Sequence, residues 1–343
     1  MNHLAMNMTS AKMRFIDVKD TTIAFNEMAI PTPSSNQCLI KVKAIGINRA
    51  DLLQKAGLYP PPAGESPILG IEVAGEIVGG NTGNFTLGDR VCGIVAGGGY
   101  AEYAVIDKDH LIKLPMHFSF AQGAALAETY LTAYQALCAI GQLKQNEKVL
   151  IHAGASGVGT AAIQLAKAKG CFVAVTVGNE AKMNACKALG ADITINYNTT
   201  SFSHWAKTNQ HHFNVILDVV AGSYVNQNIK VAAVDARIVV LAILGGRYAE
   251  QLDVARMLQK RVTLSASTLR NRSDTYKADL VQAFTSEFTQ LLYGQSLSHE
   301  QLQPKDLIQP VIDTVFSWQE VELAHQKMAE NKNIGKLVMT VDE

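Results

Sequence analysis

Residues 151–162, IHAGASGVGTAA, carry the pattern that decides the fold. The apolar run EKVLIHAG leads into them and predicts a buried β-strand, and GVGTAAIQLAKAKG follows as a helix that ends at Gly170. A glycine-rich loop between a strand and a helix is typical of the phosphate-binding turn of dinucleotide folds. The glycines let the backbone approach a pyrophosphate, and the helix N-terminus offers N–H groups with partial positive charge. We therefore expect a dinucleotide here, in preference to a plain tight turn.

Two registers of the glycine pattern overlap in this loop. Gly154, Ser156 and Gly159 form G-x-G-x-x-G with serine in the middle, whereas Gly157, Gly159 and Ala162 form G-x-G-x-x-A. Each pattern is weak alone and gains its weight from the strand and helix around it. The Ser156 hydroxyl adds a donor for a phosphate or for the nicotinamide side. We assign four residues of the loop to the cofactor: Ser156, Gly157, Val158 and Gly159.

The order of apolar runs along the chain predicts two kinds of domain. Before residue 132, short runs such as CLIKVKAIGI and GIEVAGEIVGG are separated by Gly, Asn, Asp and Pro, which indicates a β-rich domain. Over residues 132–269, near-continuous apolar strands alternate with helices, which predicts a doubly wound parallel sheet. Helices are predicted over residues 223–234 and 274–293, and a further helix and strand follow.

Composition narrows the class of protein. The 343 residues suffice for two domains of about 100–200 residues each. The 30 Lys and Arg residues balance 30 Asp and Glu residues, so charge gives no basis for binding nucleic acid or an anionic membrane. Charged residues are 17% and apolar residues 48%, which favours a well-buried enzyme or an oligomer with apolar interfaces.

The cysteines and the chain ends bear on the compartment. The five cysteines are scattered and never spaced C-x-x-C, which argues against a disulfide framework and a structural zinc site. The first residues lack the pattern of a signal peptide, and no apolar run approaches the ~18 residues of a membrane span. We expect a cytoplasmic protein in a reducing compartment.

The end of the second strand of the parallel sheet bears on the choice between NAD and NADP. NAD-binding folds place Asp or Glu there, about 20 residues after the glycine loop, to hold the ribose 2′-hydroxyl. Here the run TVGNEAKM has Gly178 and Asn179 instead, and Lys182 follows in the next helix. Lys182 suits a 2′-phosphate, and Tyr197 adds a phenolic donor, so we expect NADPH. Glu180 is an argument against NADPH, because a carboxylate near the site would repel the 2′-phosphate. Alternatively, Lys182 is a solvated residue on the helix face and Tyr197 only packs.

Four stretches and the domain order resemble the zinc-free quinone oxidoreductases of the medium-chain dehydrogenase/reductase superfamily. The stretches are INRADLLQKAGLYPPP, PILGIEVAGEIV, HAGASGVGTAAIQLAK and NKNIGKLV. A fifth, STLRNRSDTYKADLVQAFT, favours the p53-inducible type over zeta-crystallin itself. The resemblance implies a GroES-like β-rich catalytic domain over residues 1–131 and 270–343 and a Rossmann NADPH-binding domain over 132–269. We also expect a homodimer, with which the low charge content is consistent.

Two substitutions bear on metal chemistry. Related zinc alcohol dehydrogenases carry a catalytic cysteine where this chain has Asn48, followed by an aspartate that matches Asp51. They carry a zinc-binding histidine where this chain has Ile71, before Glu72. Isoleucine cannot bind zinc, and an amide is a poor ligand beside a thiolate or imidazole. We therefore expect no metal, and an acceptor that is already electrophilic, such as a quinone.

The remaining site residues come from the loops and from the resemblance. Tyr59, in the proline-stiffened loop GLYPPPAG, is the substrate-side candidate, with a turn-capping tyrosine as the alternative. Asn48 and Ser156 are the other two predicted catalytic residues. The alternative for Asn48 is a side chain that only stabilises a turn. Glu128 either faces the site or ties the domains together. Further residues are assigned to the cofactor: Thr132, Leu244, Leu269 and Asn333.

The function expected is NADPH:quinone oxidoreductase activity, in which hydride passes from the nicotinamide to a quinone without zinc. One alternative is an NADPH-dependent enone or 2-alkenal reductase, because such acceptors are also activated without a metal. Another, of a different class, is a non-catalytic, crystallin-like protein that binds NADPH. Basic-aromatic clusters for nucleic acid are absent from the sequence.

Overall fold

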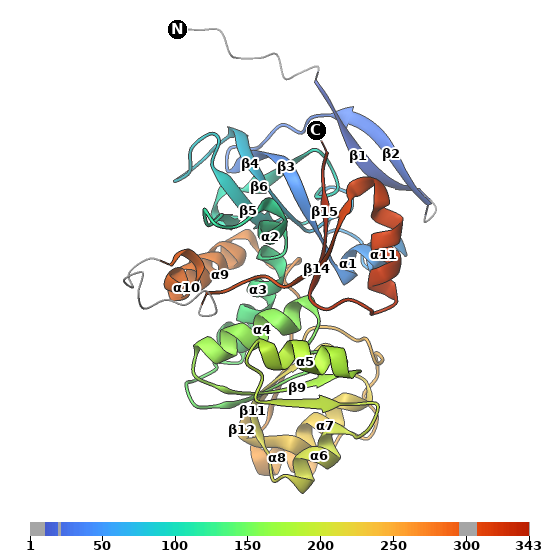
Figure 1. Cartoon of the computed structure of the whole chain (residues 1–343), viewed down its shortest axis with the longest axis vertical. Coiled ribbons are helices and arrows are strands. Elements are labelled where there is room, and N and C mark those ends of the chain that lie inside the picture. The colour runs from blue at the N-terminus through green and yellow to red at the C-terminus, as the bar shows by residue number, and fades with distance from the viewer. Residues whose placement is uncertain (1–10, 20–21, 295–306, 343) are drawn as a thin grey trace. The chain divides into compact units, whose positions relative to one another are not determined.

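The computed structural model describes residues 11–19, 22–294 and 307–342. The chain forms two compact units. In Figure 1 the colour follows the sequence from blue at the N-terminus to red at the C-terminus. We call residues 129–269 the α/β unit, and residues 1–128 together with 270–343 the β-rich unit. Helix α3 (Ala127–Tyr134) and a π-helical segment (Gln135–Ile140) carry the chain into the α/β unit.

A parallel sheet forms the centre of the α/β unit. Its described strands are ordered β10-β9-β8-β11-β12-β13, and each pairs parallel with its neighbours. The strands are β8 (Lys148–Ile151), β9 (Phe172–Val177), β10 (Ile193–Asn196), β11 (Phe213–Asp218), β12 (Ala232–Val240) and β13 (Thr263–Ala266). The helices between them are α4 (Gly157–Ala168), α5 (Glu180–Ala188), α6 (Phe202–Thr208), α7 (Ser223–Val231) and α8 (Val254–Lys260). This is the doubly wound fold predicted from the alternation of strands and helices.

The sheet has its topological switch point between β8 and β11. The chain winds outward from β8 through β9 to β10, then returns to β11 and winds the other way to β13. The central strands are apolar on both faces because helices cover both faces, so β8 and β11 are almost wholly buried. In such sheets, ligands bind beyond the carboxyl ends of the strands at the switch point. The glycine loop follows β8 at this place.

The strands of the β-rich unit pair antiparallel, except that β14 and β15 pair parallel. Its main sheet runs β14-β15-β3-β4-β5-β7, with β6 paired to β3, and a separate hairpin joins β1 to β2. The strands are β1 (Lys12–Lys19), β2 (Thr22–Ala29), β3 (Gln37–Ile47), β4 (Glu72–Gly80), β5 (Arg90–Ile94), β6 (Tyr103–Asp107), β7 (Leu111–Lys113), β14 (Ile312–Ser317) and β15 (Lys336–Thr340). The helices are α1 (Arg49–Lys55), α2 (Phe120–Ala124), α9 (Asp274–Glu287), α10 (Thr289–Tyr293) and α11 (Val321–Ala329).

The C-terminal tail completes this sheet. Strand β15 pairs antiparallel with β3, its register joining Leu337 to Ile47, and Figure 1 shows the red tail beside the blue strands. Trp318 and Leu337 pack in the same core as Ile40 and Ile45 of β3. This explains why two sequence segments form one unit: neither buries its apolar face without the other.

Two predicted helices differ in extent from the structure. The helix expected over residues 223–234 ends at Val231, and β12 begins at Ala232, which pairs with Phe213 of β11. Sheet pairing overrides the helical pattern of these residues. The helix expected over 274–293 is divided into α9 and α10 at Phe288, whose ring is buried against Phe284. Local periodicity does not reveal either tertiary contact.

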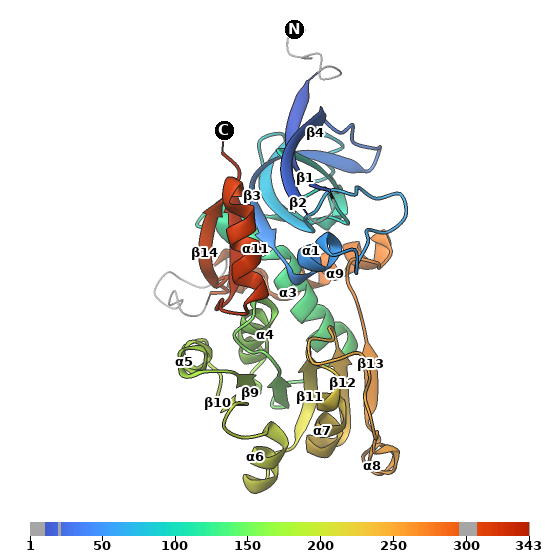
Figure 2. The same ribbon diagram turned by 90° about the vertical axis from the view of Figure 1, so that its right-hand side faces the viewer.

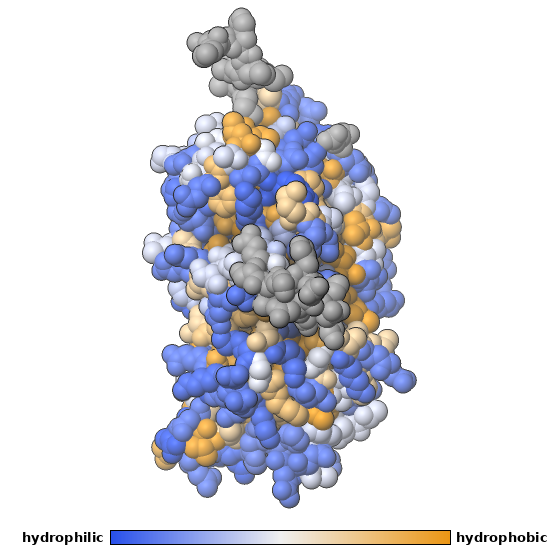
Figure 3. Space-filling model, turned by 60° about the vertical axis from the view of Figure 1, so that its left-hand side comes forward, coloured by the Kyte–Doolittle hydropathy of each residue, from blue (hydrophilic) through white to orange (hydrophobic). Residues whose placement is uncertain are grey.

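The surface is mixed in character. On the face drawn in Figure 3, hydrophilic residues predominate and hydrophobic ones are scattered among them. Within the described residues, none of the helices combines the length and the apolar character that crossing a bilayer requires.

Candidate active site

The glycine loop in the α/β unit starts a helix with a side-chain cap. Ser156 is the N-cap of α4, and its Oγ accepts a hydrogen bond from the Gly159 N–H at 3.0 Å. A Cβ on Gly159 would lie 2.4 Å from the Ala153 carbonyl oxygen, so only glycine fits where the helix starts against the loop. The cap uses the oxygen of Ser156 and leaves its proton for another acceptor.

This arrangement fits a pyrophosphate. Helix α4 has 12 residues, and the N–H groups of its first turn have no intrahelical acceptors. Their partial positive charge favours an anion at this end. Gly157, Val158 and Gly159, all predicted to bind the cofactor, form that first turn.

Four more predicted residues lie together at the ends of β9 and β10. A Cβ placed on Gly178 would lie 2.5 Å from the Tyr197 hydroxyl, so this hydroxyl rests against the Gly178 backbone. Asn179 caps α5 and accepts from the Lys182 N–H at 2.9 Å, which puts Lys182 on the first turn of that helix. Lys182 is half-buried, whereas Glu180 is exposed. The α/β unit thus gathers a lysine, a phenol and an amide where the sequence lacks the acid of NAD-binding folds.

The other predicted cofactor residues are more dispersed. Leu244 is exposed in the loop after β12, and its N–H donates to the Val219 carbonyl at 3.3 Å. Leu269 is buried just beyond β13, at the same carboxyl edge of the sheet. Thr132 lies on α3, and Asn333 belongs to the β-rich unit, so neither unit by itself brings these two together.

A buried polar network that the sequence did not reveal ties three strand ends together. His152, after β8, contacts Thr176 Oγ1 of β9 at 3.0 Å and Asn228 Oδ1 at 2.7 Å. Asn228 Nδ2 donates to Asp218 Oδ2 of β11 at 2.8 Å. Burial lowers the pKa of His152, so its neutral form is favoured. The network fixes the backbone beneath the glycine loop.

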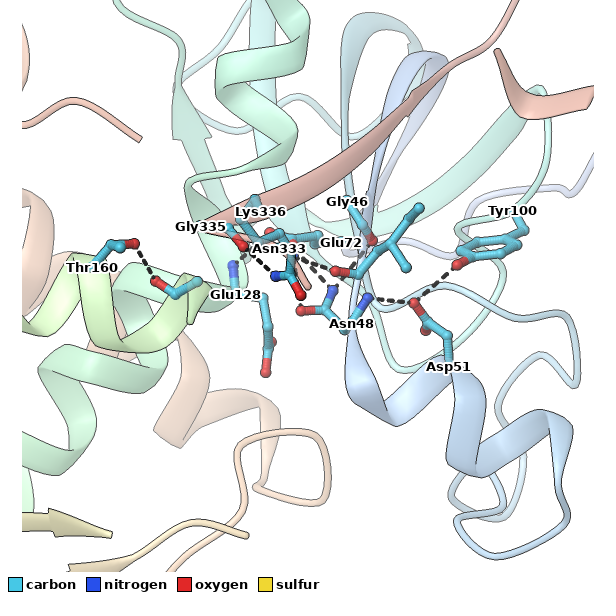
Figure 4. Close-up of polar contacts among 12 residues, drawn as sticks. Gly46, Asn48, Asp51, Glu72, Tyr100, Glu128, Thr160, Asn333, Gly335 and Lys336 are labelled. Atoms are coloured by element: carbon cyan, nitrogen blue, oxygen red, sulfur yellow. Dashed lines mark hydrogen bonds and ion pairs between the residues drawn. The ribbon is translucent and has the colours of Figure 1, made fainter. Parts of the chain in front are cut away.

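In the β-rich unit, a buried ion pair holds Asn48. Lys336 is 3% exposed and Glu72 is 0% exposed, and the Lys336 ammonium donates to Glu72 Oε1. It also donates to Asn48 Oδ1 and to the Ile47 carbonyl, each at 2.8 Å. Figure 4 shows the side chains of Glu72 on β4, Lys336 on β15 and Asn48, between β3 and α1, lying together. All three donors of the ammonium are therefore used within the protein.

The Asn48 amide is oriented by this pair. Asn48 Nδ2 donates to Glu72 Oε1 at 2.9 Å and to the Gly46 carbonyl at 3.2 Å. The second Glu72 oxygen accepts from the Glu128 N–H at 2.9 Å. Both amide hydrogens of Asn48 are thus engaged, and its oxygen accepts from Lys336.

A second buried chain starts on helix α1. Asp51 Oδ2 accepts from the Asn48 N–H at 2.8 Å and from the Tyr100 hydroxyl at 3.0 Å. Tyr100 also contacts His325 Nε2 at 3.0 Å. Burial raises the pKa of Asp51 to about 6, although the Asn48 N–H and the Lys336 charge oppose the shift. Burial lowers the pKa of His325 to about 4.

Tyr59 lies under a guanidinium. The Arg270 Cζ atom is 5.3 Å from the centre of the Tyr59 ring, within the range of a cation–π contact. Burial raises the pKa of Tyr59, whereas the Arg270 charge opposes this shift. Arg270 lies 174 residues or more along the chain from the residues to which it donates hydrogen bonds, and no local pattern marks it.

The positions of the lost zinc ligands offer amide and apolar groups. Ile71 is buried, and Asn48 is bound to Lys336 and Glu72 as described above. Over the described part of the chain, no group of three or more His, Cys, Asp or Glu side chains has the geometry to hold a metal ion.

Comparison with known proteins agrees with this architecture. The family model "Alcohol dehydrogenase GroES-like domain" matches residues 34–116, and "Zinc-binding dehydrogenase" matches residues 157–286. A quinone oxidoreductase of Sus scrofa is 30% identical over 324 residues, which is 92% of each chain. That of Homo sapiens is 28% identical with the same coverage.

Solved structures share the fold. The quinone oxidoreductase of Coxiella burnetii has a TM-score of 0.74 and 27% identity, covering 97% of this chain and 100% of its own. The CurK enoyl reductase has a TM-score of 0.81 at 23% identity, covering 96% and 99%. The second likeness concerns the fold alone.

Fold and site therefore define a medium-chain dehydrogenase/reductase, in which a GroES-like unit accompanies a Rossmann unit. The chain belongs to the quinone oxidoreductase family of this superfamily. It is an oxidoreductase, and the proteins of this class use a nicotinamide cofactor. The resemblance to the family is confirmed, and the narrower likeness to the p53-inducible type stays a prediction.

Proposed function

We propose that this protein reduces quinones by hydride transfer from NADPH without zinc. The observation that carries the proposal is the state of Asn48, whose amide is bound to Lys336 and Glu72 at the place of a catalytic metal ligand. An amide and the apolar Ile71 offer no thiolate or imidazole, which supports a reaction that needs no Lewis acid. The acceptor must then be electrophilic already, and the quinone oxidoreductases among its relatives support a quinone.

The chemistry follows from such an acceptor. The nicotinamide supplies a hydride, and NADPH, a quinone and one proton give NADP⁺ and a hydroquinone. The Tyr59 hydroxyl donates a hydrogen bond to the quinone oxygen on which negative charge develops. Asn48 offers its oxygen as an acceptor to a hydroxyl of the substrate or of the nicotinamide ribose. Solvent protonates the hydroquinone anion.

The α/β unit binds the cofactor in this proposal. The first turn of α4 and the Ser156 hydroxyl bind the pyrophosphate, and Lys182, Asn179 and Tyr197 surround the 2′-phosphate. Leu244, Leu269 and Thr132 line the rest of the cofactor, with Asn333 from the β-rich unit. The proposed boundaries remain residues 132–269 for the cofactor domain and residues 1–131 with 270–343 for the catalytic domain.

A panel of acceptors tests the choice of substrate. Steady-state NADPH oxidation is measured with ortho-quinones, para-quinones and small enals at matched concentrations. The proposal expects kcat/KM for the best quinone to exceed that for every enal. A preference for enals would instead establish the enone reductase, and NADPH binding without turnover on any acceptor would favour the crystallin-like protein.

We further propose a homodimer in the cytoplasm. Strand β13 is the edge of the parallel sheet, and Figure 2 shows where β13 and α8 lie. Both elements carry exposed apolar side chains. They include Leu264, Val254 and Leu258. An open edge with apolar neighbours is well suited to pair with a second copy. None of the five cysteines, all of which lie in the described ranges, is in a disulfide, and four are buried, which suits a reducing compartment.

A further inference from the structure

Arg270 joins three segments of the β-rich unit. Its side chain is buried, and the residue is 6% exposed. Nε donates to the Ala96 carbonyl at 2.6 Å, and Nη2 donates to Gln54 Oε1 at 2.8 Å. Gln54, on helix α1, in turn donates to the Pro67 carbonyl at 2.8 Å. One guanidinium thus links α1 to the loop after β5, and through Gln54 to the loop before β4.

The same guanidinium covers Tyr59. It lies over the ring with Cζ 5.3 Å from the ring centre, and Nη1 is 3.4 Å from the Tyr59 carbonyl oxygen. A planar guanidinium can stack on a ring and donate hydrogen bonds at its edge at the same time, which a lysine ammonium cannot do. Much of the loop that carries Tyr59 is exposed, with Leu58 at 74%. The contacts with Arg270 therefore connect this exposed loop to the buried framework.

Besides these contacts, the charge of Arg270 affects the acidity of the Tyr59 hydroxyl. Burial raises the pKa of Tyr59, and the Arg270 cation partly reverses this. Burial lowers the pKa of Arg270 itself, and the nearby Tyr59 and Asp51 oppose that shift. Arginine remains charged in any such environment. A cation beside a phenol makes its hydroxyl a stronger hydrogen-bond donor than burial alone would leave it.

We propose that Arg270 is a positioning residue for Tyr59: it fixes the phenol ring and strengthens the hydroxyl as a donor to the acceptor's oxygen. This rests on the proposed function, in which Tyr59 contacts that oxygen. Arg270 acts through Tyr59 and need not touch the acceptor. Its replacement is then expected to alter turnover and to leave the cofactor interactions of the α/β unit unchanged.

A double-mutant cycle tests the inference. Arg270→Lys retains the charge but loses the planar fork, and it is expected to lower kcat for a quinone by about tenfold or more. The NADPH dissociation constant is expected to stay within about twofold, because Lys182 and Ser156 are unaffected. In the Tyr59→Phe background, Arg270→Lys is expected to change kcat by less than about twofold, because the hydroxyl that it positions is already gone.

The controls separate this effect from loss of structure. Arg272→Lys changes an exposed arginine two residues away, which stacks on Tyr276, and should leave kcat near that of the wild type. Thermal unfolding identifies variants that fail to fold, and Arg270→Gln, which removes the charge and keeps polar groups, serves as the second variant. It is expected to lower kcat at least as much as Arg270→Lys.

Three outcomes would overturn the inference. An equal loss from Arg270→Lys in the wild-type and Tyr59→Phe backgrounds would show that Arg270 acts independently of the hydroxyl. A second outcome is that folded Arg270→Lys and Arg270→Gln variants both have a normal kcat while Tyr59→Phe is impaired. That result would refute only the role of Arg270 and would leave the proposed function intact. A wild-type protein that oxidises no NADPH with any quinone would refute the proposed function, and the inference with it.

Discussion

Asn48 is held by side chains that lie far from it in the sequence. Glu72 comes from the next strand and Lys336 from the end of the chain, and both contact the Asn48 amide within 3 Å. Removing one partner of a buried ion pair is costly because the other charge is left without compensation. The sequence predicted Asn48 as a site residue because it stands at the position of a lost metal ligand. It could not predict Lys336 as its partner, since 288 residues separate them.

Lys182 provides the most direct test of cofactor choice among single side chains. Lys182→Ala is expected to weaken NADPH binding by about tenfold or more, because a charge-assisted hydrogen bond to the 2′-phosphate is lost. NADH, which lacks that phosphate, should bind within about twofold of the wild type. Fluorescence titration with both nucleotides measures the two constants.

Lys187→Ala is the matched control for this experiment. Lys187 is an exposed residue in the last turn of the same helix, α5. It should leave both constants unchanged. Equal weakening of NADPH and NADH in Lys182→Ala would show that the lysine does not contact the 2′-phosphate.

Asp51 should make stability depend on pH. Its folded-state pKa is raised to about 6 by burial, above the ~3.9 of an unfolded aspartate, so the folded protein binds the extra proton between these values. The stabilising contribution is complete below pH ~4 and is lost as the pH rises through ~6. Asp51→Asn removes this titration. Its free energy of unfolding relative to wild type should therefore rise between pH 4 and pH 7, by on the order of 1–3 kcal/mol.

Urea unfolding at several pH values measures this difference. Asp279→Asn, at an exposed position of α9, is the control and should give a difference that is constant with pH. Parallel stability curves for Asp51→Asn and wild type would mean that Asp51 has an ordinary affinity for protons in the folded state.

The helices and strands were largely predictable where periodicity and caps agree. The run from EKVLIHAG to Gly170 became β8, the glycine loop and α4 as expected. Helix α1 was missed because it has seven residues inside a β-rich region, too few for an amphipathic pattern. The extents of α7 and α9 were wrong because Ala232 joins a sheet and Phe288 enters a core. Contacts distant in sequence decided these cases.

Helix α4 offers a test of the loop as an element. Ser156→Ala removes the cap acceptor for Gly159 and should lower stability by about 0.5–2 kcal/mol. It should also weaken NADPH binding, because the hydroxyl and the order of the first turn both contribute to the phosphate site. Chemical unfolding and fluorescence titration measure the two effects.

Ser201→Ala provides the comparison. Ser201 caps α6 in the same unit, where its Oγ accepts from the His204 N–H at 3.1 Å. This variant should lose similar stability and keep the affinity for NADPH. If both variants bind NADPH as the wild type does, the Ser156 loop is a structural turn and no phosphate site.

For the whole molecule, the sequence predicted the two kinds of domain but not the atoms that join the β-rich segments. Strand β15 pairs with β3 through a register that no local pattern encodes. Tyr59 was predicted as a site residue from its loop. Its contact with Arg270 was not predicted, because no local pattern reveals a contact between residues so distant in sequence. Residues adjacent in sequence, such as Gly178, Asn179 and Lys182, were the ones that could be grouped in advance.

Assembly is tested through the edge of the parallel sheet. Native protein should have twice the 37.0 kDa mass of one chain in sedimentation analysis. Leu258 of α8 is 80% exposed, and Leu258→Glu should shift the mass toward the monomer. Leu323→Glu, which changes an exposed leucine of α11 in the other unit, should not. A monomeric wild type would refute the dimer, and an unchanged mass for Leu258→Glu would place its interface elsewhere.

A single-turnover measurement decides whether the protein reduces a quinone with NADPH and without a metal. Chelator-treated protein is mixed with stoichiometric NADPH and then with an ortho-quinone, and absorbance follows NADPH while chromatography measures hydroquinone. We expect one NADPH to be consumed per hydroquinone formed, at a rate that neither chelator nor added zinc changes. Bound NADPH that persists in the presence of the quinone, or oxidation that requires added zinc, would contradict it.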